Sequence, residues 1–411
     1  MKTKGILSRR GFLKGAALTA GAVAGTRLAG GAHGLLPDAK AATLGHGGVL
    51  VIYTLGGFNS IFPSFSSLGS TSFGAGMTGL NLGNGLIVDP SYSKLSTFAQ
   101  QNMATVGTKH GQSAHDSAEN ATWGDGTNNY MIQLADALGG DGSIKAVYLG
   151  GNKPQGPTPA VNGTSLQQIS DLQSTIDTLS GKGDATVPDR TLALKGVTAA
   201  QAMSQGRLTA SPKGLVTLGQ GYGASVDTLT KPPKIFQFSD FNTAYTLNNK
   251  TNVGSFAAQM AGAELMFAAG ANVVCAMTGF NWDSHGDTSA NNVRNMMSTT
   301  IIPPLNTFIN RNMVAGGGGA AELDSVGNQR NITVIFMGDF ARSLPGSDHQ
   351  PNMSVTAFGP KVKVGTTGET DKNVGLPAST PGMKGLWSYL AAVSGVSANP
   401  FGANPHTAIT K

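Results

Sequence analysis

The sequence predicts an α/β fold with a mostly parallel central sheet. Short and almost purely apolar runs recur along the chain, as at 48–55, 271–277 and 332–337, and such runs are typical of strands that are buried on both faces. Segments with helical character lie between them, of which the Ala- and Met-rich segment 256–269 is the clearest. Strands that alternate with helices favour a parallel sheet with helices on its faces.

The individual elements follow from the same patterns. We expect strands at 48–55, 103–107, 144–149, 271–277 and 332–337, and a late strand or edge at 362–364. We expect helices at 130–138, 166–179, 256–269, 290–313 and 383–393, the fourth restarted at its Pro-Pro pair. The second has apolar residues at every third or fourth position, which indicates one apolar helix face. We expect a loop at 68–90 and a polar segment at 110–125. We expect residues 181–233 to form a loop-rich excursion from the core.

Residues 1–41 predict an export signal that is cleaved. Residues 8–14 read Ser-Arg-Arg-Gly-Phe-Leu-Lys, the pattern of a twin-arginine signal, and a Gly- and Ala-rich stretch leads to the small-x-small site at 39–41. A membrane anchor is the alternative, but the stretch is short and Arg27 interrupts it. We therefore expect the twin-arginine translocase as a partner, a periplasmic or extracellular location, no permanent membrane span, and a single domain over 42–411.

The charge of the chain changes when this segment is set aside. The full chain carries a formal net charge of +6, but residues 1–41 hold seven basic residues and one acid. Residues 42–411 then have 21 basic and 21 acidic residues, so nucleic acid is not an expected partner. The single cysteine, Cys275, lies in an apolar run and predicts an inert buried thiol.

Carboxylates and imidazoles follow two of the predicted strands. In a parallel sheet both segments emerge at the edge where α/β proteins place their sites. Carboxylate and imidazole donors suit a divalent ion such as Zn²⁺, Mn²⁺, Mg²⁺ or Ca²⁺. The alternative is a set of loop residues that cap helices and bond to the backbone. The candidate ligands are Asp283 and His285 after the first strand and Asp339, Asp348 and His349 after the second.

Further candidates stand beside these segments. Arg342 could hold a pair of phosphate or sulfate oxygens, or form a structural ion pair with Asp339. Ser113 and His115 place a hydroxyl near an imidazole, as nucleophilic catalysis requires. Asn59 can ligate through its carbonyl oxygen but supplies no charge. Trp123 and Trp282 lie next to the polar segments, where they line a pocket or, as is commoner, fill the core.

The ordered set of motifs resembles the domain of unknown function 1501 family, whose members are twin-arginine-exported bacterial proteins related to sulfatases and alkaline phosphatases. The matching stretches are Gly-Gly-Phe-Asn at 56–59, Ser-Ala-His at 113–115 and the residues up to 119, Phe-Asn-Trp-Asp-Ser-His at 280–285, Gly-Asp-Phe-Ala-Arg at 338–342, and Ser-Asp-His at 347–349. The Trp-Asp-Ser-His and Asp-Phe-Ala-Arg pieces are the most specific.

The resemblance implies an alkaline-phosphatase-like three-layer α/β sandwich. It places the five candidate ligands where related phosphatases and sulfatases bind metal, and it takes the nucleophile from the Ser113 segment. This chain departs from the family pattern at several positions. Asn59 replaces a carboxylate, Asp339 replaces Glu, and Gln350 replaces Gly; the Ser-His segment carries an extra residue, Ala114, or is shifted. Loss of the carboxylate at position 59 would weaken a two-metal site, so a site with one metal or none is an alternative.

Two functions are compatible with these features. The first is an exported metal-dependent hydrolase of phosphate or sulfate esters, with a small anionic ester as its substrate. The second is a catalytically silent exported protein that uses the same fold for binding or cell-surface assembly. Convergence of the candidate ligands in the folded chain is the observation that discriminates between them.

Overall fold

The computed structural model of this protein describes residues 44–57, 62–65, 76–140, 142, 144–180, 190–210, 235–282, 285, 289–342 and 348–411. All of these residues belong to one unit, Thr43–Lys411. The predicted export signal lies outside the described residues, as do Asn59 and Asp283.

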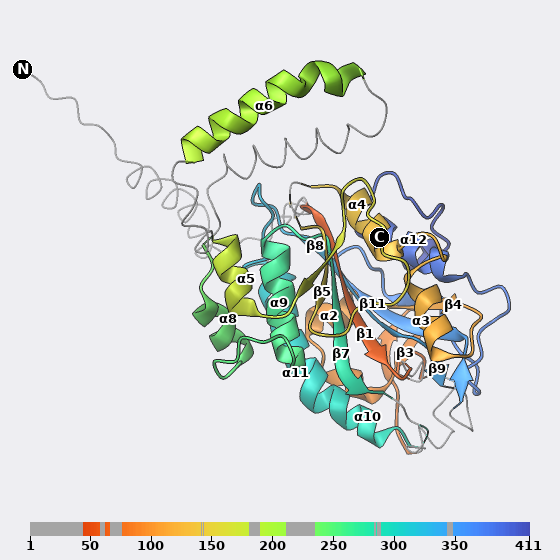
Figure 1. Ribbon diagram of the computed structural model, residues 1–411. Helices are drawn as coiled ribbons and strands as arrows, with labels where there is room; N and C mark the ends of the chain where they lie inside the picture. Colours follow the sequence, from red (N-terminus) through yellow and green to blue (C-terminus); the bar gives the residue numbers. More distant parts are fainter. Residues whose placement is uncertain are drawn as a thin grey trace, which may run out of the picture. The chain divides into compact units, whose positions relative to one another are not determined.

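A central sheet of eight strands organises this unit (Figure 1). Its order is β12-β4-β11-β8-β1-β7-β5-β6. Neighbouring strands are parallel except where β11 pairs with β4 and β8. The strands are β1 Gly47–Leu55, β4 Met103–Lys109, β5 Ala146–Leu149, β6 Leu166–Ile169, β7 Val273–Asn281, β8 Asn331–Gly338, β11 Asn352–Phe358 and β12 Gly365–Thr366. The expected α/β class with a mostly parallel sheet is therefore confirmed.

The first strand lies at the centre of the sheet. Val51 of β1 stands opposite Cys275 of β7 on one side and Ile335 of β8 on the other. All three side chains are fully buried. A strand with neighbours on both edges and helices on both faces has no solvent-facing side, which explains why these segments are continuously apolar rather than alternating.

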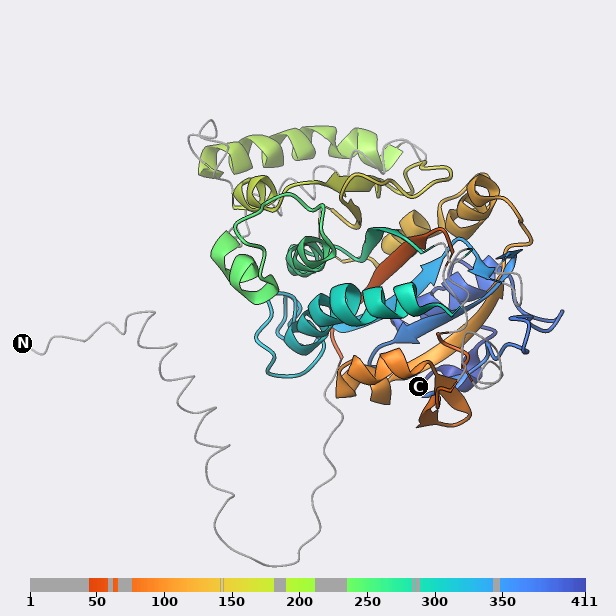
Figure 2. The ribbon, with the colours of Figure 1, turned by 90° about the horizontal axis from the view of Figure 1, so that it is seen from below.

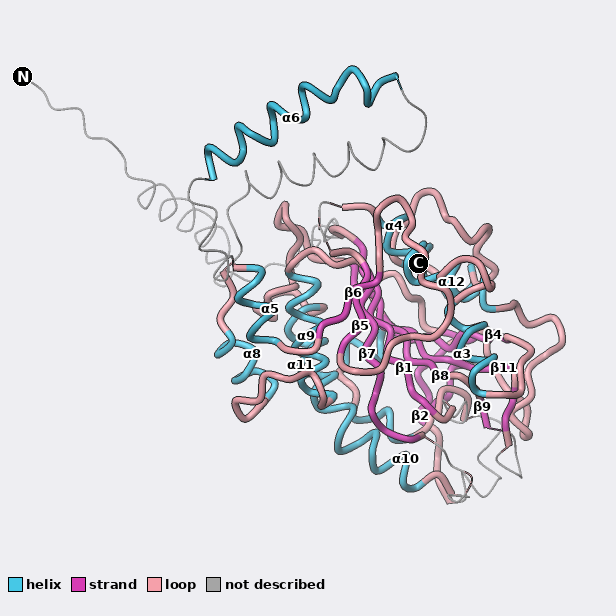
Figure 3. The backbone as a smooth tube through the Cα atoms, in the orientation of Figure 1, coloured by secondary structure: helices cyan, strands magenta, loops and turns pink. Residues whose placement is uncertain are grey.

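Helices cover the two faces of the sheet (Figures 1 and 3). On one face α9 packs on β7 and β5, and α8 and α11 pack on α9. On the other face α4 packs on β7 and β5, and α12 packs on β4 and α4. The helices are α2 Thr97–Gln101, α3 His115–Trp123, α4 Tyr130–Leu138, α5 Leu172–Leu179, α6 Arg190–Ala210, α8 Phe238–Tyr245, α9 Phe256–Ala268, α10 Asn291–Met296, α11 Ile302–Asn312 and α12 Met383–Val393. This arrangement is consistent with a three-layer sandwich.

Side-chain caps begin several of these helices where the sequence places short polar residues. The side chain of Asn129 accepts a hydrogen bond of 3.1 Å from the backbone of Ile132 at the start of α4. Ser255 does the same for Ala258 at the start of α9, at 3.2 Å. Each cap satisfies a backbone N–H that has no partner within the helix.

Other predictions need correction. The expected helix at 166–179 is a strand, β6, followed by α5, because its apolar residues continue in phase across two elements. The expected loop at 68–90 contains a hairpin of β2 Leu80–Gly83 and β3 Leu86–Val88 and the start of the 3₁₀ turn η1 Pro90–Lys94. The expected excursion at 181–233 includes the long helix α6. The late strand falls at β12 rather than at 362–364.

The helix expected at 290–313 is one rod with an irregular middle (Figure 2). Between α10 and α11 runs a π-helical turn, η2 Met297–Ile301. The irregularity lies just before Pro303 and Pro304, which have no backbone N–H to donate to the preceding turn. The predicted restart is thus confirmed, because α11 begins at Ile302, one residue before the Pro-Pro pair.

Aromatic residues fill the core beneath the polar segments. Trp123 and Trp282 are fully buried, so their interpretation as core residues is confirmed. The indole of Trp282 donates a hydrogen bond of 3.0 Å to the hydroxyl of Thr278. Cys275 is a free and buried thiol, as expected.

Among the described residues, no helix is long and apolar enough to cross a membrane. The remaining short elements are β9 Ala341–Arg342, β10 His349–Gln350 and the 3₁₀ turn η3 Thr407–Ile409.

Candidate functional site

The carboxyl-terminal edge of the central strands gathers most of the predicted site residues. β4, β1, β7 and β8 all run in one direction, so their last residues meet at one edge. His110 follows β4, Asp339 follows β8, and His285 follows β7. The short pair β9–β10 returns the chain to this edge and sets His349 opposite Arg342. We call His110, His115, His285 and His349 the histidine cluster.

A buried carboxylate holds one imidazole of this cluster. Asp339 Oδ2 lies 2.5 Å from Nδ1 of His115, the first residue of α3. The side chain of Asp339 is 2% exposed and that of His115 is 48% exposed. Because a carboxylate accepts here, His115 carries its proton on Nδ1 and keeps the lone pair of Nε2 for a group outside the protein. Within the described part of the chain, Asp339 Oδ1 is buried without a hydrogen-bond partner.

His110 holds the backbone of the same aspartate. Its Nε2 lies 2.7 Å from the carbonyl oxygen of Asp339, and its Nδ1 accepts a hydrogen bond of 3.0 Å from the backbone N–H of Gln112. These two contacts require the opposite tautomer to that of His115, with the proton on Nε2. Burial lowers the pKa of His110, with an opposing effect from its contacts with Asp339, and a neutral ring suits this bonding pattern.

Phe340 forms the hydrophobic centre of the cluster. Its ring is fully buried and stacks on His349, with centroids 4.3 Å apart and planes 12° apart. It also meets His115 and His110 edge-on, at 5.0 and 5.7 Å. His349 in turn lies 4.6 Å from His115 and 5.7 Å from His285 between ring centroids. A single buried aromatic ring therefore contacts three imidazoles from two segments of the chain, and His349 links them to His285.

Arg342 ties two further segments to this edge. Its guanidinium donates to the carbonyl oxygen of Gly56, at the end of β1, and its Nη1 lies 3.0 and 3.1 Å from the two ring nitrogens of His285. Arg342 is only 1% exposed. A Cβ atom on Gly57 would lie 3.0 Å from Arg342 Nε, and Gly57 has a φ of +100°, so the close approach requires glycine there.

A second carboxyl group lies behind the cluster. Glu119 stands one turn after His115 on α3 and is 6% exposed. Burial, and after it the charges of Asp339 and Asp116, raise the pKa of Glu119 from 4.5 to about 7, against the opposing effect of His115. Burial also raises the pKa of the Tyr53 phenol well above 10, and Asp339 adds to that effect. Buried acids with raised pKa values beside an exposed imidazole are typical of reactive sites.

The predicted site residues have different positions in the structure. His115, His285, Asp339, Arg342 and His349 are brought together at the sheet edge, as described above. Ser113 is exposed and contributes its backbone carbonyl, which accepts a hydrogen bond of 3.1 Å from His349 Nδ1. Asp348 is exposed, and its Oδ1 accepts from the backbone N–H of His349 at 2.7 Å. Asp283 and Asn59 lie outside the described residues.

Three residues of this arrangement, His110, Glu119 and Phe340, were not among the predicted site residues. His110 begins the polar segment that follows the strand expected at 103–107, which is the signal that marked the other candidates. Glu119 lies four residues after His115, a spacing that places both on one face of a helix. Phe340 lies inside the Asp-Phe-Ala-Arg motif but has no polar chemistry to suggest a role. The contacts of all three depend on segments that are distant in the sequence.

The metal prediction stays a prediction. Among the residues that the structure describes, no three His, Cys, Asp or Glu side chains form a group that could hold an ion. The donor types do fit one, because imidazoles with a lone pair, an exposed carboxylate and the unpartnered Asp339 Oδ1 lie at one edge. The Asp339–His115 hydrogen bond is also of the kind that orients metal-bound histidines.

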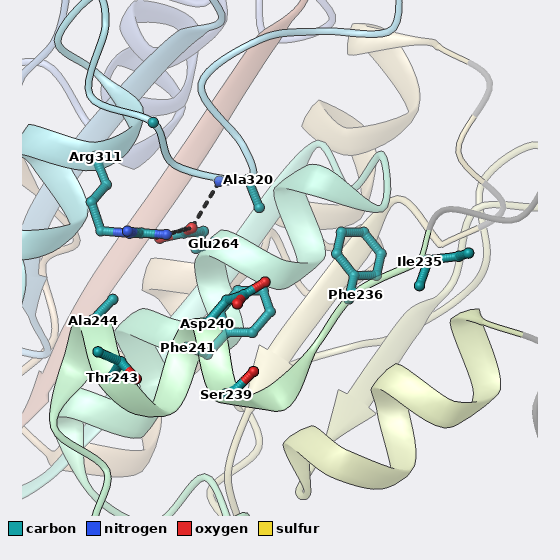
Figure 4. A pocket seen from close by; sticks show the side chains of 11 residues that line it. Ile235, Phe236, Ser239, Asp240, Phe241, Thr243, Ala244, Glu264, Arg311 and Ala320 are labelled. Atoms are coloured by element: carbon teal, nitrogen blue, oxygen red, sulfur yellow. Dashed lines mark hydrogen bonds and ion pairs between the residues drawn. The ribbon is translucent and has the colours of Figure 1, made fainter. Parts of the chain in front are cut away.

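A cavity of about 750 Å³ lies elsewhere, between α8, α9, α11 and the loop before β8 (Figure 4). Its wall includes Glu264, which is fully buried and paired with Arg311 at 2.9 and 2.8 Å. Tyr245 and the backbone of Ala320 also donate to this carboxylate, both within 2.8 Å. These polar groups satisfy one another, so we place the chemistry at the sheet edge and not in this cavity.

Comparison of the chain with protein-family models, with curated proteins and with solved structures found no match.

Proposed function

We propose that this protein is an exported hydrolase of phosphate or sulfate esters that acts at the histidine cluster. The observation that carries the proposal is the Asp339–His115 pair, in which a buried carboxylate presents a half-exposed imidazole to solvent. Oriented carboxylate–imidazole pairs of this kind serve as general bases because the carboxylate fixes the tautomer and stabilises the imidazolium.

The chemistry of the pair follows from its hydrogen bond. In the proposed reaction, Nε2 of His115 takes a proton from the attacking hydroxyl, which belongs to water or to Ser113. The new bond forms from that oxygen to phosphorus or sulfur, and the bond to the ester oxygen breaks. The proton on His115 then passes to the leaving alcohol. If Ser113 attacks, a water molecule then displaces the phosphoryl or sulfuryl group from its oxygen in a second step of the same kind, which restores the free hydroxyl. Asp339 keeps its hydrogen bond to Nδ1 and offsets the positive charge that His115 acquires.

The surrounding charges favour an anionic substrate. Arg342 places a buried positive charge directly behind His285, although its own nitrogens are engaged with that ring and with Gly56. His115 and His349 add N–H and lone-pair groups on the solvent side. Because Asp339 is 2% exposed and His115 is 48% exposed, an anionic ester that approaches this edge meets the imidazole of His115 before it meets the carboxylate.

A divalent ion fits the same donors. The imidazoles of His285 and His349 and the carboxylates of Asp283, Asp339 and Asp348 would hold it. When bound, it would polarise the ester oxygen and stabilise the charge of the transition state. The parallel sheet and two helical layers support the finer proposal of an alkaline-phosphatase-like sandwich, and the twin-arginine pattern at 8–14 supports export.

The test is ester turnover by protein exported and folded in its native host. The protein is treated with a chelator, restored with Zn²⁺, Mn²⁺, Mg²⁺ or Ca²⁺, and assayed with aryl phosphates and aryl sulfates. We expect turnover in at least one form, and a loss of about 100-fold or more in kcat/KM for His115→Ala. His46→Gln is the control, because His46 bonds to Asn272 at the opposite edge of the sheet. Absence of turnover in every form would contradict the proposal.

A further inference from the structure

We infer that His110 is a positioning residue for the Asp339–His115 pair, fixed as the Nε2–H tautomer while His115 is fixed as the Nδ1–H tautomer. The inference deepens the proposed function and rests on it for its consequence in catalysis. The two tautomers are opposite, and that of His115 depends on His110. Both statements can be tested without any measurement of turnover.

The bonding of His110 leaves a single consistent assignment. Its Nδ1 faces the backbone N–H of Gln112 at 3.0 Å, which can only donate, so Nδ1 must accept. Its Nε2 faces the carbonyl oxygen of Asp339 at 2.7 Å, which can only accept, so Nε2 must donate. Neither contact survives a change of tautomer. Because both ring nitrogens are engaged inside the protein, His110 is neither a base nor a ligand in this arrangement.

The position of His110 in the fold allows it to fix the backbone of Asp339. The residue directly follows β4, and its backbone N–H donates to Pro351 at the start of β11. β11 separates β4 from β8 in the sheet, so β4 and β8 do not bond to each other directly. The imidazole of His110 crosses this gap to the carbonyl of Asp339. This hydrogen bond fixes the position of Asp339, the first residue after β8, relative to the end of β4. It also fixes Asp339 relative to α3, which follows β4 and carries His115.

Loss of the His110 hydrogen bond would affect His115 through Asp339, which bonds to both histidines. Asp339 receives His110 on its backbone and His115 on its side chain. A shift of the Asp339 backbone would lengthen the 2.5 Å contact to His115 Nδ1. His115 would then lose its tautomer preference, since little else distinguishes the two nitrogens of a half-exposed ring. The same logic makes outer partners of active-site histidines worth about 10- to 100-fold in affinity or activity.

Two substitutions separate the hydrogen bond from the shape of the ring. His110→Phe keeps an aromatic ring against Phe340 and removes the donor. His110→Gln keeps an amide N–H near the position of Nε2. Histidine tautomers are read by nitrogen-15 NMR of the metal-free, chelator-treated full chain, with each resonance assigned by its loss in the corresponding histidine variant.

In the unaltered protein we expect His110 protonated at Nε2 and His115 protonated at Nδ1. In His110→Phe we expect His115 to become a mixture of tautomers and kcat/KM to fall about tenfold or more, with KM changing less than kcat. In His110→Gln we expect the His115 tautomer and most of the rate to return. An Nδ1–H tautomer at His110, or an unchanged His115 tautomer in folded His110→Phe, would overturn the inference. If His110→Phe does not fold, the tautomers of the unaltered protein and of His110→Gln decide the matter. Absence of turnover with the expected tautomers would overturn the proposed function alone.

Discussion

Replacement of Glu119 by Gln should stabilise the protein above neutral pH and leave it unchanged in acid. Burial and the charge of Asp339 raise the pKa of Glu119 from 4.5 to about 7. In the unfolded chain the carboxyl ionises near 4.5, so the folded state binds the proton more tightly between these pH values. The free energy of unfolding therefore decreases as pH rises from about 4.5 through 7, and levels off above.

The size of this effect follows from the two pKa values. Their difference corresponds to about 3 kcal/mol, at about 1.4 kcal/mol for each pKa unit. Glu119 is 6% exposed, so solvent screens little of it. Gln resembles the protonated acid in shape and does not ionise. Glu119→Gln should therefore match the unaltered protein at pH 4.5 and exceed it by about 3 kcal/mol at pH 8.

The assay is urea unfolding of chelator-treated protein across this pH range, because a bound cation would itself change the ionisation of Glu119. Asp240→Asn is the control, since Asp240 is exposed on α8 and is not among the charges that raise the pKa of Glu119, and its replacement should change stability by about 0.5 kcal/mol or less. If Glu119→Gln and the unaltered protein lose stability in parallel from pH 4.5 to 8, Glu119 ionises as an ordinary carboxyl and the reasoning is refuted.

Three further changes test other parts of the structure. Gly57→Ala should destabilise by about 2–3 kcal/mol in urea unfolding, because it adds a close contact with Arg342 to a strained φ. Gly126→Ala, with a φ of +88° and no neighbour within 4 Å, should cost about 1–2 kcal/mol, and equal losses would refute the role of the contact. Glu264→Gln should cost about 3–5 kcal/mol in the same assay because it removes the buried negative charge that pairs with Arg311; a loss below that of the exposed Asp240→Asn would contradict this. His349→Gln should weaken binding of Zn²⁺ by about tenfold or more in calorimetry, and an unchanged affinity would exclude His349 as a ligand.

The central strands could be predicted from the sequence because their surroundings are uniform. β1 and β8 are buried on both faces, so each appears as an unbroken apolar run. β11 was not predicted although it also has a neighbouring strand on each side. Its buried Ser354 and Thr356 break the apolar run, and the hydroxyl of Thr356 has a partner in Tyr92, 264 residues away. A strand cannot be recognised from its local apolar pattern when it contains buried polar residues whose hydrogen-bond partners are distant in the sequence.

The location of the site at the sheet edge could be predicted from the sequence. The contacts between its side chains could not. Residues that follow parallel strands must meet at one edge, and this placed His285, Asp339 and His349 together. The sequence gives no sign that Asp339 would point to His115 or that Arg342 would be buried behind His285. Those contacts depend on the angle at which α3 and the β9–β10 pair leave the sheet, which is set by tertiary packing.

The coupling between His115 and Asp339 tests the central claim most directly. In a double-mutant cycle on kcat/KM for the ester that is turned over, His115→Ala and Asp339→Asn should each cost about 100-fold or more. The double variant should be no worse than the poorer single variant, because the two side chains act as one base. Full additivity of the two losses, or an Asp339→Asn variant as active as the unaltered protein, would contradict the account.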